Sequence, residues 1–190
     1  MVEEVEPPRG REAVVEALVE AATSLFAQRG PAAVSLRDVA EAAGVNLGLI
    51  HRYIGSKEDL LTTVLARRRR EDTFTGDPEE YVLQFLTRDP GERLHLRVLM
   101  RAALDGYDVR RLEPDAPNVK GFARLLGSSM DQLDADVRTA LAVAVIFGWT
   151  AMGPTALAML GRRRINEAAL EAALRPAVAA MLRAEPQSSE

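Results

Sequence analysis

The chain has 190 residues, of which 47% are apolar and 27% charged, so it can bury a core and lies outside the composition range of disordered proteins. It has no cysteine and two histidines, which excludes a disulfide framework, thiolate metal sites and cysteine nucleophiles and argues against structural zinc. The formal net charge of -4 is unusual for a protein that binds nucleic acid, but it is unevenly distributed: residues 9–70 hold ten Lys and Arg against seven Asp and Glu, whereas residues 71–190 hold fourteen against eighteen.

Strand signals are scarce, because alternating β-branched runs are missing while Ala, Leu, Arg and Glu dominate stretches of helical length. Turn signals at clusters of glycine, proline and aspartate divide the chain into about nine helices. The sequence therefore predicts an all-α protein. Residues 1–10 are acidic, contain proline and lack the apolar run of a secretory signal, so we expect a flexible segment there.

The first predicted helix spans residues 11–28 and needs a partner, because one stripe of it is apolar: Val14, Leu18, Ala21, Leu25 and Phe26. Gly30 occupies the usual position after a helix end. Three short helices with well-defined starts follow. Ser35 with Asp38, and Ser56 with Asp59, have the spacing of a capping box, and Asn46 is a good single N-cap.

The second and third helices are separated by a tight turn. The helix predicted over residues 36–43 ends at Gly44, which can take a positive φ, and the next helix begins at Leu47. Such a turn lets two helices cross steeply. This is the helix-turn-helix geometry, in which the second helix presents its outer face to a DNA major groove.

Residues 34–61 resemble the DNA-binding segment of the tetracycline-repressor (TetR) family of bacterial regulators. The match includes the Ala-Ala-Gly-Val turn at 42–45, the small residue Gly48 and the Gly-Ser-Lys-Glu-x-Leu-Leu run at 55–61. With the first helix it covers about residues 11–70, and beyond that only length and helical character agree. The resemblance implies a cytoplasmic homodimer that binds pseudo-palindromic operator DNA and a small-molecule effector.

The spacing of residues within the motif predicts its two faces. Six apolar residues face inward, namely Val39, Ala40, Ala43, Val45, Ile50 and Ile54, and six residues are left outside, namely Arg37, Leu47, Gly48, Leu49, His51 and Arg52. Arg37 can donate a bidentate pair to guanine or reach a phosphate, and it matches a position that the family uses for operator contact. Leu47 and Leu49 suit thymine methyl groups, and Gly48 allows close backbone approach.

Further DNA contacts are predicted at the ends of these helices. His51 and Tyr53 stand where the family usually carries Tyr and His, and either ring can bond a phosphate, although a solvated or packing histidine is the alternative for His51. Lys57, at the start of the fourth helix, is predicted to clamp a phosphate. The predicted DNA-binding set is Ser35, Arg37, Asn46, Leu47, Gly48, Leu49, His51, Arg52, Tyr53 and Lys57. The four arginines at 67–70 could form a patch that binds nucleic acid. We prefer the alternative explanation, that positive charge is favourable at the C-terminus of a helix.

The last two long helices, predicted over 136–161 and 166–184, supply apolar surface for a dimer. Ala140, Ala144 and Gly148 recur every four residues and permit close helix packing, and the family forms its dimer with the corresponding helices. Residues 139–160 carry no charge and meet the length test for a membrane span. Their many Ala, Thr, Gly and Pro residues favour a helix buried on nearly all sides by protein instead.

Pro154 predicts a kink within this apolar stretch. The resemblance also implies an effector cavity, for which ordinary core packing is the alternative, with candidate walls at Phe85, Met100, Phe122, Met130, Phe147, Trp149 and Met152.

We therefore expect a flexible segment at 1–10, a helix-turn-helix domain with its linking helix at 11–70 and a ligand-binding and dimerisation domain at 71–190. The predicted function is a transcriptional regulator, usually a repressor in this family, that a small molecule releases from DNA. The alternative is a small-molecule-binding helical protein whose helix-turn-helix no longer binds DNA. Motifs of hydrolases, phosphate loops, dinucleotide sites and metal pairs are missing, so we expect no catalytic residue, cofactor or metal site, and no enzyme.

Overall fold

The structure, a computed structural model, describes residues 10–69, 76–87, 94–114, 116–162 and 164–183. Within these ranges the chain forms ten helices and no strand, which confirms the all-α class. There is one helix more than predicted, because the segment before Pro114 divides near Gly106. The flexible segment expected at 1–10 lies outside the described residues except for Gly10.

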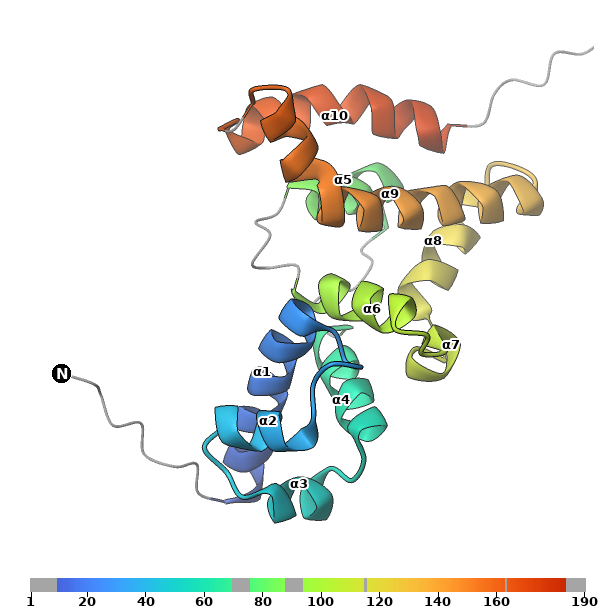
Figure 1. Ribbon diagram of the computed structural model, residues 1–190. Coiled ribbons are helices and arrows are strands. Elements are labelled where there is room, and N and C mark those ends of the chain that lie inside the picture. Colours follow the sequence, from blue (N-terminus) through green and yellow to red (C-terminus); the bar gives the residue numbers. More distant parts are fainter. Residues whose placement is uncertain (1–9, 70–75, 88–93, 115, 163, 184–190) are drawn as a thin grey trace, which may run out of the picture. The chain divides into compact units, whose positions relative to one another are not determined.

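The helices pack into two compact units. Figure 1 labels the helices and colours them by their position in the sequence. Unit 1 comprises residues 1–72 and 94–114, and its helices are α1 (Arg11–Arg29), α2 (Leu36–Ala42), α3 (Leu47–Tyr53), α4 (Lys57–Arg69), α6 (Leu94–Leu104) and α7 (Val109–Leu112). Unit 2 comprises residues 73–93 and 115–190, and its helices are α5 (Pro78–Thr87), α8 (Pro117–Leu126), α9 (Gln132–Met159) and α10 (Glu167–Leu182).

Helix α1 is the centre of unit 1, because it contacts α2, α3, α4 and α6. Its fully buried side chains Leu18 and Phe26 share one apolar core with Ile50 of α3, Leu61 of α4 and Val98 of α6. The predicted stripe of α1 is therefore the face that this core covers.

Two helices that follow the predicted domain boundary at residue 70 pack with unit 1. Helix α6 buries Val98 and Ala102 in the core of unit 1, and α7 buries Leu112 there. Residues 94–114 thus pack with the helix-turn-helix segment rather than with the rest of 71–190. An amphipathic helix shows that it needs a partner, but its own pattern does not say which one.

In unit 2, α5 contacts α8, α9 and α10. Its Val82, Leu83, Phe85 and Leu86 are buried. The ring of Tyr81 packs edge-on against Phe85 at a centroid distance of 5.0 Å and lies 5.9 Å from Phe122 of α8. These aromatic contacts join α5 and α8 in the core of this unit.

Helix α9 is 28 residues long and begins earlier than predicted, because Asp131 caps it by accepting the N–H of Leu133 at 2.8 Å. Pro154 lies inside the helix, which bends towards its C-terminal end (Figure 1), as predicted from the missing amide. Before the proline, Trp149 Nε1 donates to the carbonyl of Leu86 at 2.8 Å and ties α9 to the last turn of α5.

The prediction that this apolar helix is buried on nearly all sides is wrong for the single chain. By length and composition α9 is apolar enough to cross a membrane, which is weak evidence by itself, but only 17% of its apolar window is buried. Its exposed apolar side chains include Leu133, Val137, Leu141 and Val145, which follow one another every four residues. The helix therefore presents an apolar stripe that no part of the described chain covers.

Candidate nucleic-acid interface

Helix α2 starts at a complete capping box, as predicted. The Ser35 N–H donates to Asp38 Oδ2 at 2.7 Å, and the Asp38 N–H donates to Ser35 Oγ at 3.1 Å. The backbone and hydroxyl bonds from Ser35 hold the pKa of the Asp38 carboxyl below its ordinary value. The residue at which α2 starts is therefore fixed by reciprocal local bonds.

The turn between α2 and α3 has the predicted form. Gly44 has a φ of 64°, in the left-handed region that favours glycine. The Gly44 N–H donates to Glu41 O at 3.1 Å and the Val45 N–H donates to Ala40 O at 3.0 Å, which closes the end of α2. Asn46 then caps α3 by accepting the Gly48 N–H at 2.8 Å. The two helices are joined by a short turn that backbone bonds and the Asn46 cap hold in place.

The structure separates the two predicted faces of this motif. On the inner face Val39, Ala40 and Ile50 are buried, and three further residues pack against the core with partial exposure, namely Ala43, Val45 and Ile54. On the outer face the exposed residues are Ser35, Arg37, Asn46, Gly48, His51 and Arg52. Most of the predicted DNA-binding set therefore lies on one accessible side of unit 1.

Leu47 and Leu49 differ from the expectation of a fully outward position. Both are half-buried and pack against the core of unit 1, as does Tyr53. Arg52 places its guanidinium 5.6 Å from the centroid of the Tyr53 ring, within reach of a cation–π contact. Only part of each leucine is left to meet a thymine methyl group.

Lys57, the predicted phosphate clamp, bonds the backbone of its own chain. Its Nζ donates to the carbonyls of Pro31 at 2.8 Å and Val34 at 3.3 Å, and the side chain is half-buried. The ammonium is thus directed into the protein, at the segment between α1 and α2. Its acceptors lie more than twenty residues away in the sequence, so the local pattern could not reveal them.

Of the arginines at 67–70, Arg67 forms an ion pair with Glu16 of α1. The pair joins the last turns of α4 to α1. Arg70 lies outside the described residues, as do the side chains of Arg68 and Arg69.

The structure places six of the predicted effector walls in unit 2 and one in unit 1, and they differ in burial. Phe85 and Phe122 are buried near one another in unit 2, whereas Met130, Phe147 and Trp149 are half-buried. Met152 is 57% exposed, so it is not a wall within the single chain, and Met100 lies on α6, in unit 1.

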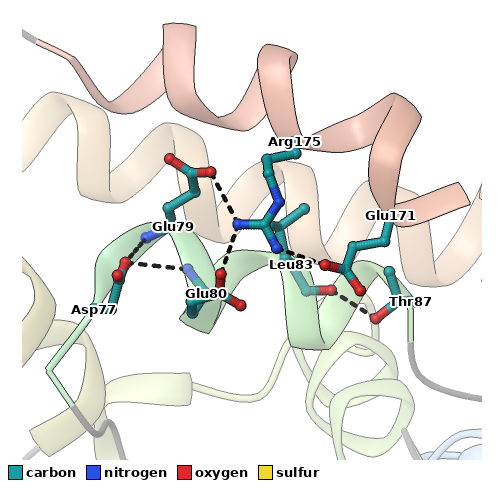
Figure 2. Close-up of polar contacts among 7 residues, drawn as sticks. All are labelled: Asp77, Glu79, Glu80, Leu83, Thr87, Glu171 and Arg175. Atoms are coloured by element: carbon teal, nitrogen blue, oxygen red, sulfur yellow. Dashed lines mark hydrogen bonds and ion pairs between the residues drawn. The ribbon is translucent and has the colours of Figure 1, made fainter. Parts of the chain in front are cut away.

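A hollow of about 600 Å³ in unit 2 lies beside a charged group that sequence reasoning missed. Figure 2 shows Arg175 of α10 directed at Glu79 and Glu80 of α5 and at Glu171 of its own helix. The bonds to Glu80 and Glu171 raise the pKa of the guanidinium. The spacing of Glu171 and Arg175 is that of a helical ion pair and could have indicated half of this group.

The predicted dimer residues Ala140, Ala144 and Gly148 are all exposed on α9. A Cβ built on Gly148 would meet nothing within 4 Å, so the backbone of α9 is open there to another surface. In the described ranges no group of three His, Cys, Asp or Glu side chains could hold a metal ion.

Comparison with known proteins gives a consistent result. The profile of "Bacterial regulatory proteins, tetR family" matches residues 18–64. The chain is 38% identical over 182 residues to the HTH-type transcriptional repressor Rv3405c of Mycobacterium tuberculosis, an alignment that covers 92% of each chain.

Two solved structures share the fold. Salmonella enterica GusR has a TM-score of 0.66 at 14% identity and covers 95% of this chain and 98% of its own. A TetR-like transcriptional regulator from Rhodococcus sp. RHA1 has a TM-score of 0.59 at 22% identity, with coverages of 90% and 96%. The near-full-length relative confirms the expectation of a regulator rather than an enzyme. The chain belongs to the TetR family of bacterial helix-turn-helix transcriptional regulators.

Proposed function

We propose that this regulator is a homodimeric repressor that binds a pseudo-palindromic operator and leaves it when a small molecule binds. The observation that carries the proposal is the outward face of α2 and α3, two helices with capped starts, where Arg37, Gly48, His51 and Arg52 are exposed. Repression is favoured because the near-full-length relative of Mycobacterium tuberculosis is named a repressor. Operator binding would place the protein in the cytoplasm.

Arg37 is the first candidate for reading a base. It is exposed two residues after the cap of α2, and a guanidinium can donate two parallel bonds to guanine O6 and N7. His51 and Arg52 stand in the last turn of α3 and suit phosphate oxygens. Gly48 keeps the start of α3 free of a side chain, so that its backbone can approach the groove.

A dimer follows from the small size of this face. One short recognition helix contacts few phosphates, whereas two copies about one DNA turn apart double the contacts and read a pseudo-palindrome. The exposed stripe of α9, with Ala140, Ala144 and Gly148 along it, offers the surface for a second copy. Burying that stripe would also remove its apolar side chains from water.

For effector control, the proposal rests on family membership. An effector that prefers a conformation with the two α3 helices at the wrong separation would lower operator affinity by that preference. The walls of its cavity are proposed among the unit 2 residues Phe85, Phe122, Met130, Phe147 and Trp149.

The test is binding to the duplex DNA that flanks the protein's own gene, measured by fluorescence anisotropy with a salt titration. The proposal predicts a footprinted, two-fold symmetric site whose affinity falls steeply with salt and exceeds that for a scrambled duplex. Equal and weak binding to both duplexes at every salt concentration would favour the alternative, a helical small-molecule-binding protein with an inactive helix-turn-helix.

A further inference from the structure

The segment between α1 and α2, residues 30–34, joins the end of α1 to the start of α2 and so affects where α2 lies within unit 1. It follows Arg29 at the end of α1 and leads into the Ser35 cap, two residues before Arg37. Its own bonds are few: the Gly30 N–H donates to Phe26 O at 3.0 Å and the Val34 N–H donates to Pro31 O at 3.4 Å. A segment with such sparse internal bonding needs partners from elsewhere to hold one position.

Three charged side chains supply those partners. Arg29, at the end of α1, donates to the Ala33 carbonyl at 3.3 Å, and the other two side chains come from later helices. Lys57 of α4 donates to the carbonyls of Pro31 and Val34, at 2.8 and 3.3 Å. Asp105, directly after α6, accepts the Ala32 N–H on Oδ2 at 2.8 Å. A cation therefore bonds acceptors of the segment while an anion bonds one of its donors, and both line one open hollow of about 630 Å³.

Asp105 is itself held in place by its backbone. The Asp105 N–H donates to Arg101 O at 2.8 Å, and the two residues after it donate to Ala103 O at 3.1 Å and Ala102 O at 3.0 Å. This is the bond pattern that closes a helix end. Because Ala102 is fully buried in the core of unit 1, the carboxyl of Asp105 is carried on a fixed support.

Gly30 makes room for this carboxyl. It is buried, with a φ of 83°, and a Cβ built on it would lie 2.8 Å from Asp105 Oδ2. Any side chain at this position would both strain the backbone and push the carboxyl away from Ala32. Asp105 can therefore approach this closely because residue 30 has no side chain.

We propose that Lys57 and Asp105 are positioning residues for operator binding: by holding residues 30–34 from two different helices, they set the place of Arg37 relative to α3. This inference rests on the operator binding proposed above. It assigns Lys57 a role inside the protein in place of the phosphate clamp, and it gives Asp105 a role in DNA binding although its charge repels phosphate.

That repulsion gives the test a definite sign. Removing a carboxylate that acts only through its charge strengthens DNA binding, whereas removing one that positions Arg37 weakens it. In Asp105→Ala we expect operator affinity to fall about three- to tenfold, the range of a single hydrogen bond, with affinity for a scrambled duplex unchanged or higher. Asp105→Asn keeps an acceptor oxygen, so it should restore operator affinity. Glu58→Ala, which removes another carboxylate from the same hollow, should not weaken binding.

Lys57→Ala separates positioning from phosphate contact. A lost phosphate contact reduces the slope of log affinity against log salt by about one unit, whereas lost positioning lowers operator affinity with little change of slope. Combined with Asp105→Ala, it should cost less than the two single changes together, because both act on one segment.

Three results would overturn the inference: Asp105→Ala binding the operator as tightly as the wild type, equal loss on both duplexes, or no recovery in Asp105→Asn. If Asp105→Ala does not fold, as judged by circular dichroism, Gly30→Ala displaces the same carboxyl and should show the same selective loss. Failure of the wild type to prefer any operator would instead refute the proposed function, and the two failures are thus distinguishable.

Discussion

Gly153 of α9 lies directly against the indole of Trp149: a Cβ built on the glycine would be 2.6 Å from Cδ2 of the ring. The same indole donates its Nε1 proton to Leu86 of α5 at 2.8 Å. The absence of a side chain at residue 153 therefore allows the ring to stay where it can join two helices of unit 2.

The first prediction concerns this contact. Gly153→Ala should destabilise the protein by about 1–3 kcal/mol, because a rigid ring bonded at its far edge cannot easily yield to an added methyl group. Chemical denaturation followed by circular dichroism measures this cost. It should shrink in the Trp149→Phe background, where the ring is smaller, and an equal cost in both backgrounds would show that the ring is not the obstacle.

The second prediction concerns acid stability. Bonds from Ser35 lower the pKa of Asp38, and bonds from Ser56 lower that of Asp59, below the ordinary value of 3.8. A depressed folded-state pKa adds stability that is present above pH 4 and is lost as pH falls through the folded value. The free energy of unfolding should therefore decline below about pH 4. The decline should be shallower in Asp38→Asn with Asp59→Asn, and an identical pH profile in wild type and variant would contradict this.

The third prediction concerns base reading by Arg37. Replacing it with Ala should weaken operator binding by about 1–3 kcal/mol and relax preference at one base position. Arg37→Lys keeps the charge but not the two-pronged donor, so it should recover affinity for scrambled DNA without recovering the preference. Selection from a randomised duplex library measures both effects. Unchanged preference in the Ala variant would remove Arg37 from the base-reading residues.

The fourth prediction concerns the exposed stripe of α9. Gly148→Leu adds a large side chain where the exposed backbone of α9 allows close approach of a second helix. The substitution should therefore shift the protein from dimer to monomer in sedimentation velocity. It should also lower operator affinity. Lys120→Leu, an equally exposed substitution on α8, should leave the dimer intact. A dimer unaffected by Gly148→Leu would place the subunit contact elsewhere.

The parts of this structure that sequence alone could predict are those whose bonds are local. The capping pairs Ser35 with Asp38 and Ser56 with Asp59 span three residues, so their spacing in the chain fixes their geometry. The turn at Gly44 is set by backbone freedom at one residue. The helix-turn-helix and its outward face follow from these few local rules.

The long-range pairs could not be predicted in this way. The partner of Asp105 lies 73 residues away, and that of Arg175 in α5 lies 95 residues away. Leu47 and Leu49 are half-buried because α3 has only seven residues and three of them, with Ile50, are large and aliphatic. Parts of both leucines therefore pack against the core beside Ile50. The exposed stripe of α9 packs against no part of the described chain, so contacts within the chain could not indicate its role.

We propose that two copies of the chain hold their α3 helices on successive turns of one face of DNA. The most direct test is the stoichiometry and affinity of binding to the footprinted operator, compared with an operator carrying five extra base pairs between its half-sites. We expect two chains per operator, and a large loss of affinity in the lengthened site, because about half a turn moves one half-site to the opposite face. One chain per operator, or equal affinity for both duplexes, would contradict the account.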